Sequence, residues 1–310
     1  MSFVRDAILA GSTNVWLREK AMRAPFVRRS VSRFMPGERI EDAIEAAREL
    51  QISRITTILT RLGENLEKAS EADEVAAHYV DVMTRVKAAG LDAQISIKPT
   101  QLGLDFDEAL CRRHLFALID GSDALGNFVW IDMESTPYVD RTLALFRAAR
   151  ERSKRVGVAI QAYLYRSARD VDELAPLGSA IRIVKGAYKE PPDLAYPKKA
   201  DVDENYFKLV VRLLQPEAVK AGCLVHIGTH DDALIERLRG HIKTNRVPRE
   251  AYEITMLYGI RRQLQQRLVA EGETMRVLIS YGEYWFPWYM RRLAERPANV
   301  MFVLKSMFQG

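Results

Sequence analysis

The sequence predicts a (βα)8 TIM barrel preceded by an N-terminal helical arm, and three observations support this prediction. Short runs rich in β-branched residues recur eight times after residue 50, and a longer helical pattern follows each run. This alternation indicates parallel strands joined by helical crossovers. The repeats span close to the ~250 residues typical of such a barrel. An open doubly wound sheet, the alternative, usually carries a GxGxxG turn after its first strand, and this sequence has none.

The predicted strands are short apolar runs. In order, they cover residues 54–59, 93–98, 128–133, 157–163, 180–185, 223–228, 252–256 and 275–280. Apolar residues spaced three and four apart predict the helices. These helical patterns cover residues 69–89, 106–119, 138–153, 170–174, 202–221, 231–243, 261–271 and 285–296. Pro191, Pro192 and Pro197 mark a long loop after the fifth strand, which we expect to face a ligand.

Residues 1–46 precede the first repeat and carry helical patterns of their own. We therefore expect an N-terminal helical arm over residues 1–46 and a catalytic barrel over residues 47–310. The arm is expected to cover one end of the barrel or to mediate association. Phe26 and Phe34 lie among arginines, a composition compatible with contact to an anionic membrane surface.

Composition narrows the class of protein. The net charge of +5 comes from 46 basic and 41 acidic residues that are interspersed, which disfavours a nucleic-acid partner. No apolar run approaches the ~18–20 residues of a membrane-spanning helix, and the N-terminus lacks the apolar core of a secretory signal. Cys111 and Cys223 form no CxxC motif, which favours a reducing compartment. We expect a cytoplasmic protein, with peripheral association at the inner face of a membrane as an option.

Charged and polar residues stand where the predicted strands end, and in a barrel these ends form one rim. They are Lys98, Asp132, Glu134, Gln161, Tyr163, Arg182, Lys185, Thr229 and His230, with Arg291 and Arg292 in the last helix. Each has a structural explanation when taken alone, such as a salt bridge or a helix cap. Their convergence on one rim instead predicts a site for a ligand that carries both phosphates and a carboxylate.

Several enzyme classes lack their motifs in this sequence. There is no Walker A loop, HExxH or GxSxG. No His, Asp and Glu set has a spacing typical of zinc, so we expect no metal. An enzyme whose cofactor supplies the chemistry is favoured. Two alternatives remain open at this point: an aldolase that uses Lys98 or Lys185 as a Schiff base, and a non-catalytic barrel that serves as a binding module.

Seven motifs occur in order along the chain. They are ISIKPTQLG (residues 95–103), IDME (131–134), QAY (161–163), RIVKGAY (182–188), TH (229–230), MLYG (256–259) and YMRRLAE (289–295). Together they resemble the proline dehydrogenase family, in particular its compact monofunctional bacterial members, over roughly residues 50–305. The resemblance implies a distorted (βα)8 barrel with non-covalent FAD. It also implies oxidation of L-proline to Δ1-pyrroline-5-carboxylate by hydride transfer to flavin N5, with a membrane quinone as electron acceptor in proline catabolism.

The same resemblance assigns residues to the substrate. Lys98, Arg291 and Arg292 are expected to bind its carboxylate, and Asp132 to position Lys98. Two arginines and a lysine would fix the orientation of the amino acid through charge-assisted hydrogen bonds. Clustered cations should also favour loss of the substrate's ammonium proton, which we expect to appear as a required deprotonation in the pH profile of kcat/KM.

The cofactor residues follow from the resemblance too. Arg182 is expected near the pyrimidine edge of the flavin, where its charge favours the reduced form. The other expected cofactor contacts are Met133, Gln161, Lys185, Gly186, Ala187, Thr229 and His230.

The wall of the proline pocket holds one departure from the family. Tyr188 and Leu257 are expected to line the ring, as the resemblance implies. The family usually carries a tyrosine on the eighth strand where this chain has Leu278. Loss of the phenol predicts a roomier pocket that discriminates less between proline and 4-hydroxyproline. A hydroxyproline-oxidising flavoenzyme of the same family is therefore the alternative function.

Overall fold

Eight parallel strands close into a barrel, and this confirms the predicted (βα)8 fold. The computed structural model describes residues 31–63 and 66–295, and for residues 291–295 it describes only the helical backbone. The strands are β1 (Thr56–Arg61), β2 (Ala93–Ile97), β3 (Val129–Ile131), β4 (Val156–Gln161), β5 (Ala180–Val184), β6 (Leu224–Gly228), β7 (Tyr252–Leu257) and β8 (Met275–Tyr281). Neighbours in the chain pair with each other, and β8 pairs with β1 from Thr56↔Arg276 to Arg61↔Tyr281.

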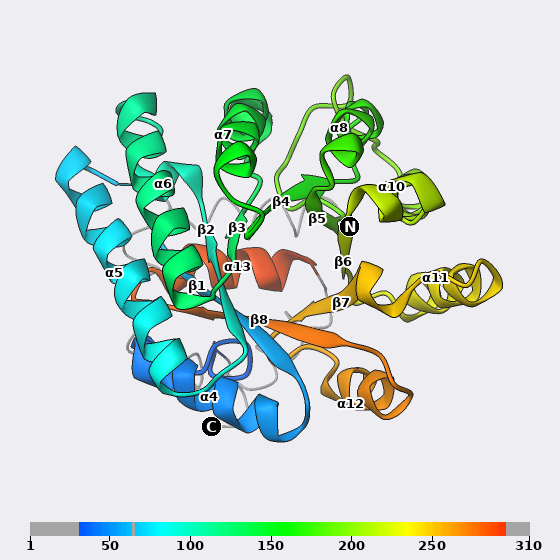
Figure 1. Cartoon of the computed structure of the whole chain (residues 1–310), viewed down its shortest axis with the longest axis horizontal. Helices are drawn as coiled ribbons and strands as arrows, with labels where there is room; N and C mark the ends of the chain where they lie inside the picture. The colour runs from blue at the N-terminus through cyan, green and yellow to red at the C-terminus, as the bar shows by residue number, and fades with distance from the viewer. Residues whose placement is uncertain (1–30, 64–65, 296–310) are drawn as a thin grey trace.

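Helices surround the barrel, as Figure 1 shows in a view along its axis. They are α4 (Ile40–Ile52), α5 (Ala69–Ala88), α6 (Glu108–Leu125), α7 (Val139–Arg152), α8 (Ser167–Leu174), α9 (Lys199–Leu213), α10 (Pro216–Ala221), α11 (Asp232–Thr244) and α12 (Arg262–Ala270). One prediction was wrong in detail, because residues 202–221 form two helices rather than one. Pro216 begins the second, since a proline has no N–H to donate within a continuing helix.

The last helix, α13 (Trp285–Glu295), leaves the ring and runs across the barrel axis (Figure 1). Its aromatic side chains do not join the main core. Trp285, Phe286, Trp288 and Tyr289 instead form a second buried cluster with Leu62, Val31 and Met35. The indole N–H of Trp285 also donates to Glu38 Oε1 at 2.9 Å. The end of the predicted arm thus packs on α13, while residues 1–30 of that arm lie outside the described residues.

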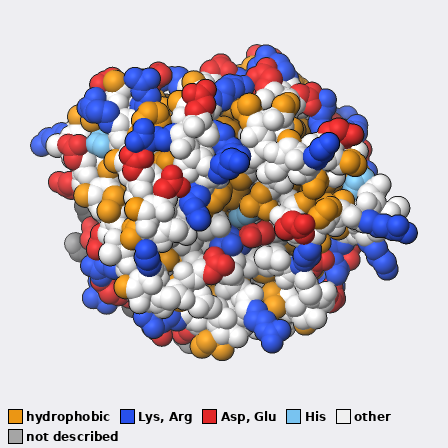
Figure 2. Space-filling view, viewed as in Figure 1, with side chains coloured by type: hydrophobic (Ala, Val, Ile, Leu, Met, Phe, Trp, Pro, Cys, Tyr) orange, Lys and Arg blue, Asp and Glu red, His pale blue; other side chains and the backbone are white. Residues whose placement is uncertain are grey.

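Basic and acidic side chains are dispersed over the face seen in Figure 2, with no large patch of one sign. Within residues 31–63 and 66–295, no helix is long and apolar enough to cross a membrane. Over the same ranges, no group of three or more His, Cys, Asp or Glu residues is placed to hold a metal ion.

Candidate active site

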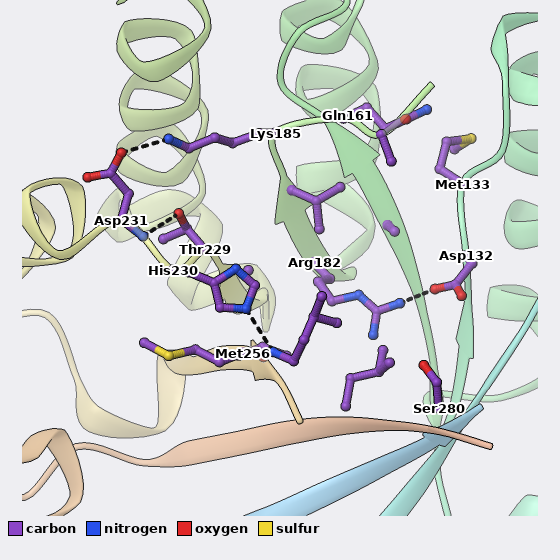
Figure 3. A pocket seen from close by; sticks show the side chains of 18 of the residues that line it. Asp132, Met133, Gln161, Arg182, Lys185, Thr229, His230, Asp231, Met256 and Ser280 are labelled. Carbon is purple, nitrogen blue, oxygen red and sulfur yellow. Dashed lines mark hydrogen bonds and ion pairs between the residues drawn. The ribbon is translucent and has the colours of Figure 1, made fainter. Parts of the chain in front are cut away.

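A cavity of about 700 Å³ lies at the carboxyl ends of the strands. This volume is within the ~300–1,000 Å³ of typical ligand pockets. The residues that the family resemblance assigns to substrate or cofactor, and whose side chains are described, all line it, namely Lys98, Asp132, Met133, Gln161, Arg182, Lys185, Gly186, Ala187, Tyr188, Thr229, His230, Leu257 and Leu278. Glu134 and Tyr163, which were also expected at the rim, are not among the lining residues. Figure 3 shows many of them converging from different strands. The structure therefore brings the predicted residues together, while the role of each remains a prediction.

Asp132 is the centre of a charged network at one end of the cavity. Its Oδ1 contacts the Nη2 of Arg182 in an ion pair (Figure 3). The same oxygen accepts a 2.8 Å hydrogen bond from Ser96 Oγ. Its Oδ2 lies 3.6 Å from the Nζ of Lys98. Arg182 also donates to Ser96 Oγ at 3.0 Å. One carboxylate thus orients two cations. The hydroxyl of Ser96 bonds to both Asp132 and Arg182 and helps to hold this pair.

Arg182 is 3% exposed, so its charge is almost fully removed from water. Burial lowers the pKa of Arg182, and the negative charge of Asp132 opposes that shift. A buried, charged guanidinium next to a cavity is the kind of group that stabilises charge developing on a ligand.

The end of β4 is tied to the turn that follows Lys98. Gln161 Nε2 donates to the carbonyl oxygen of Glu134 at 2.8 Å. The carboxylate of Glu134 accepts from Thr100, at 2.6 Å from the hydroxyl and 3.1 Å from the backbone N–H. Gln161 and Thr100 are thus both hydrogen-bonded to Glu134. Because Thr100 stands two residues after Lys98, these bonds fix the positions of Gln161 and Lys98 relative to each other.

The other end of the cavity carries two lysines and two aspartates. Lys185 Nζ lies 2.5 Å from Asp203 and 2.9 Å from Asp231, and Lys199 contacts the same two carboxylates. Burial alone would raise the pKa of Asp231, but hydrogen bonds from Lys185 and Lys199, together with their charges, hold it below its usual range. Asp231 also caps α11, whose first residues line the cavity. A helix N-terminus beside lysines favours an anionic ligand such as a phosphate.

The tautomer of His230 is set by the backbone. Its Nε2 accepts a hydrogen bond from the N–H of Leu257 at 2.9 Å (Figure 3). The neutral ring must therefore carry its proton on Nδ1. The hydroxyl of Thr229 accepts from the N–H of Asp231 at 3.2 Å, so it faces the first turn of α11.

The loop after β5 depends on glycine at position 186. Gly186 has φ +116°, and a Cβ there would lie 2.4 Å from the ring of Tyr163. Any larger residue would therefore displace the loop that carries Ala187 and Tyr188 to the cavity.

The sequence analysis missed several cavity or network residues, among them Ser96, Lys199, Asp203, Asp231 and Trp288. Ser96 stands two residues before Lys98, so strand periodicity puts it on the same face, and this signal was available. Trp288 belongs to the aromatic start of α13. Arg291 and Arg292 follow it by three and four residues, on the same side of the helix, but their side chains lie outside the described residues.

Comparison with known proteins agrees with this geometry. The model of the family described as Proline dehydrogenase matches residues 43–305. Proline dehydrogenase 1 of Bacillus subtilis subsp. natto is 36% identical over 307 residues, which cover 99% of each chain. Proline dehydrogenase of Deinococcus radiodurans is 38% identical over 283 residues, or 90% of each.

Solved structures support the fold. The chain superposes on proline utilization A (PutA) from Bdellovibrio bacteriovorus, inactivated by N-propargylglycine, with a TM-score of 0.80 at 24% identity. That match covers 87% of this chain but 33% of the other, so the chain spans about a third of the solved protein. PutA of Bradyrhizobium japonicum gives a TM-score of 0.72 at 20% identity.

Proposed function

The chain belongs to the proline dehydrogenase family, and from this premise we propose that it oxidises L-proline to Δ1-pyrroline-5-carboxylate with bound FAD and a quinone as electron acceptor. One observation carries the proposal: a single cavity holds the Lys98–Asp132–Arg182 network at one end and the Lys185 cluster at the other. A carboxylate would meet net positive charge at the first end, and a pyrophosphate would meet lysine N–H donors beside the N-terminus of α11 at the second.

The residues of the cavity fit FAD. The N-terminus of α11, with Lys185 and Thr229, suits a pyrophosphate, and Gly186 lines the same part of the cavity. Arg182 and Gln161 would contact the flavin ring, with Met133, Ala187 and His230 as further contacts. When bound, FAD supplies the two-electron acceptor that no protein side chain provides.

On the substrate side, Lys98 would bind the carboxylate together with Arg291 and Arg292. Asp132 restrains Lys98 on the cavity wall, so the amine points from a defined place rather than from a free chain. The cations around the substrate would also favour loss of its ammonium proton, since a second positive charge is disfavoured there. Only the free amine can then become the iminium of the product.

The pocket wall carries the question of specificity. Tyr188, Leu257 and Leu278 line the cavity and are each partly buried. With Leu278 in place of a phenol, we propose that 4-hydroxyproline is rejected less strongly than by family members with tyrosine.

The Schiff-base alternative is disfavoured by the ion pairs of both candidate lysines. A lysine that attacks a carbonyl is activated by an apolar pocket or by another cation nearby. Lys98 faces Asp132, and Lys185 faces Asp203 and Asp231, so each amine is held by carboxylates rather than placed in an apolar pocket.

The test is to load the purified chain with FAD and add L-proline without oxygen. Loss of the yellow flavin absorbance, and its return on addition of a soluble quinone, would support the proposal. A chain that binds no FAD, or whose flavin stays oxidised with proline, would refute it. Borohydride trapping with a carbonyl substrate should label neither Lys98 nor Lys185. Binding to anionic vesicles would test the proposed peripheral location at the membrane.

A further inference from the structure

Trp130 packs against Arg182 inside the barrel. The indole is fully buried, and the guanidinium carbon of Arg182 lies 5.2 Å from its ring centroid. At such a distance a cation is attracted by the negative face of an aromatic ring. The ring of His226 packs on the same indole with centroids 4.2 Å apart. Trp130 is therefore the aromatic side chain in direct contact with the guanidinium.

The indole is itself held in place. Its N–H donates to Gln94 Oε1 at 2.6 Å. On the adjacent strand, a Cβ at Gly157 would lie 2.5 Å from Cζ3 of Trp130. Gly157 is not among the glycines with positive φ, so its backbone does not require glycine. The space that the indole occupies does require it. Trp130 and Gly157 thus form one packed unit.

The guanidinium needs such support. Its Nη2 contacts Asp132 and Ser96, but its buried Nη1 has no hydrogen-bond partner among the described residues. A buried N–H group without a partner costs free energy, and an aromatic face offsets part of that cost. Without the indole, the guanidinium would lose one of the contacts that hold it against Asp132.

We propose that Trp130, seated in the space left by Gly157, is a positioning residue that holds the guanidinium of Arg182 against Asp132. Through Arg182 it would set the charge at the edge of the flavin. The second statement rests on the proposed function, because it requires bound FAD. The first concerns side chains of this chain alone.

The experiment compares Trp130→Leu and Trp130→Phe with the wild-type holoenzyme. Trp130→Leu should lower the rate constant of flavin reduction at saturating proline by about 10-fold, with KM changed less than about 3-fold. The reduction potential of the flavin should become more negative. Trp130→Phe keeps an aromatic face and should recover most of both properties. Phe146→Leu, which removes a buried ring from α7 far from the cavity lining, is the matched control and should leave both unchanged.

Gly157→Ala provides a second route that keeps the indole. The new methyl group must push the ring, so flavin reduction should slow in the wild-type background. In the Trp130→Leu background, where the space is open, the same change should have less than about a 2-fold effect.

A crystal structure of Trp130→Leu separates this inference from the proposed function, because it needs no cofactor. The inference holds if Arg182 leaves Asp132 in that structure. It is overturned if Arg182 keeps its contact with Asp132 in that structure. A wild-type chain that proline fails to reduce would refute the proposed function, and the position of Arg182 in the variant would still decide the role of Trp130.

Discussion

Two arginines are buried inside the same barrel, and their surroundings differ. Arg276, at the start of β8, donates to both oxygens of Glu253 at 2.6 and 3.2 Å, to Asp92 at 2.9 Å and to the carbonyl oxygen of Thr57 at 3.3 Å. Burial would lower the pKa of Arg276, but the hydrogen bonds and charges of Glu253 and Asp92 raise it above its ordinary value. The positive charge of Arg276 is thus paired with two carboxylates of the protein.

Arg182 is equally buried but has one carboxylate partner among the described residues, Asp132, and the pKa of Arg182 stays below its ordinary value. Matched pairing at Arg276 indicates a structural role, whereas incomplete pairing beside a cavity is typical of a functional group. Burial alone therefore does not distinguish the functional arginine from the structural one. The number of carboxylate partners distinguishes them.

The sharpest way to break this comparison is to remove the structural arginine. Arg276→Met should lower the free energy of unfolding by about 3–5 kcal/mol, because Glu253 and Asp92 would lose their buried partner. Denaturant unfolding measures this change. The folded fraction should keep kcat for proline within about 3-fold, since Arg276 does not line the cavity. A stable variant with lost activity would reverse the two roles.

Removing Arg182 should have the opposite profile. Arg182→Met is expected to lower kcat/KM for proline by about 10²–10³-fold, because a charge that stabilises developing negative charge is lost. Its effect on stability should be smaller than that of Arg276→Met, since Lys98 and Ser96 still face Asp132. Steady-state kinetics and unfolding of the same sample test both parts. Wild-type kcat/KM in the variant would exclude Arg182 from the chemistry.

The sequence analysis assigned a role to Arg182 and none to Arg276, but the local sequence does not distinguish the two arginines. Each is a charged residue in an apolar strand run, AIRIV or RVLIS, and such a residue is visible in any single sequence. Its pairing is not visible, because Asp92 lies 184 residues from Arg276 in the chain and Asp132 lies 50 from Arg182. Strand periodicity predicts which face a residue occupies, and tertiary contacts alone decide its partners.

The fold was predicted well for the same reason that the partners were not. Apolar runs and helical periods are local signals, so all eight strands and their order followed from them. Lys199 was missed because it begins a helix that the pattern placed at residue 202, and Trp288 because an aromatic helix start is ordinarily core. The packing of Val31 and Met35 on α13 is a contact between the two ends of the chain, for which no local signal exists.

The charges of both arginines act on His226, so the pH dependence of stability tests their surroundings. Burial first, and then the charges of Arg276 and Arg182, hold the pKa of His226 well below its ordinary value of 6.5. Below that pH the unfolded chain binds a proton that the folded chain does not, so stability falls as pH falls. The slope is up to about 1.4 kcal/mol per pH unit.

His226→Gln should therefore flatten the dependence of unfolding free energy on pH between about pH 6 and pH 5. Burial also lowers the pKa of His78, to about 4, which adds a slope of the same sign that remains in the variant. The two slopes are compared by chemical denaturation at each pH. Parallel curves for variant and wild type would show that His226 is protonated in the folded state.

The two lysines at the other end of the cavity allow a second comparison, because they share their partners but differ in exposure to water. Side chains of Lys185 and Lys199 are 27% and 72% exposed, although both contact Asp203 and Asp231. Lys185→Met should weaken FAD binding by about 10-fold, because a less hydrated charge interacts more strongly with phosphate. Lys199→Met should cost about 3-fold or less, as expected for an exposed charge. Titration of the cofactor-free chain with FAD decides, and equal losses would contradict the difference.

The smallest expected effect concerns Leu278, an apolar side chain on the same strand as Arg276. Leu278 packs against the cluster of Ile58, Trp130 and Ala180 and also lines the cavity. Leu278→Tyr would place a phenol where the family resemblance implies one and narrow the pocket. The ratio of kcat/KM for proline over 4-hydroxyproline should rise by about 3–10-fold, because one hydroxyl in an apolar pocket is discriminated only modestly. Leu257→Met, which keeps the volume of the wall, is the control and should leave the ratio within about 2-fold. An unchanged ratio in Leu278→Tyr would mean that position 278 does not set the specificity for the substrate ring. Leu278 would then serve only as an apolar side chain packed on Ile58, Trp130 and Ala180.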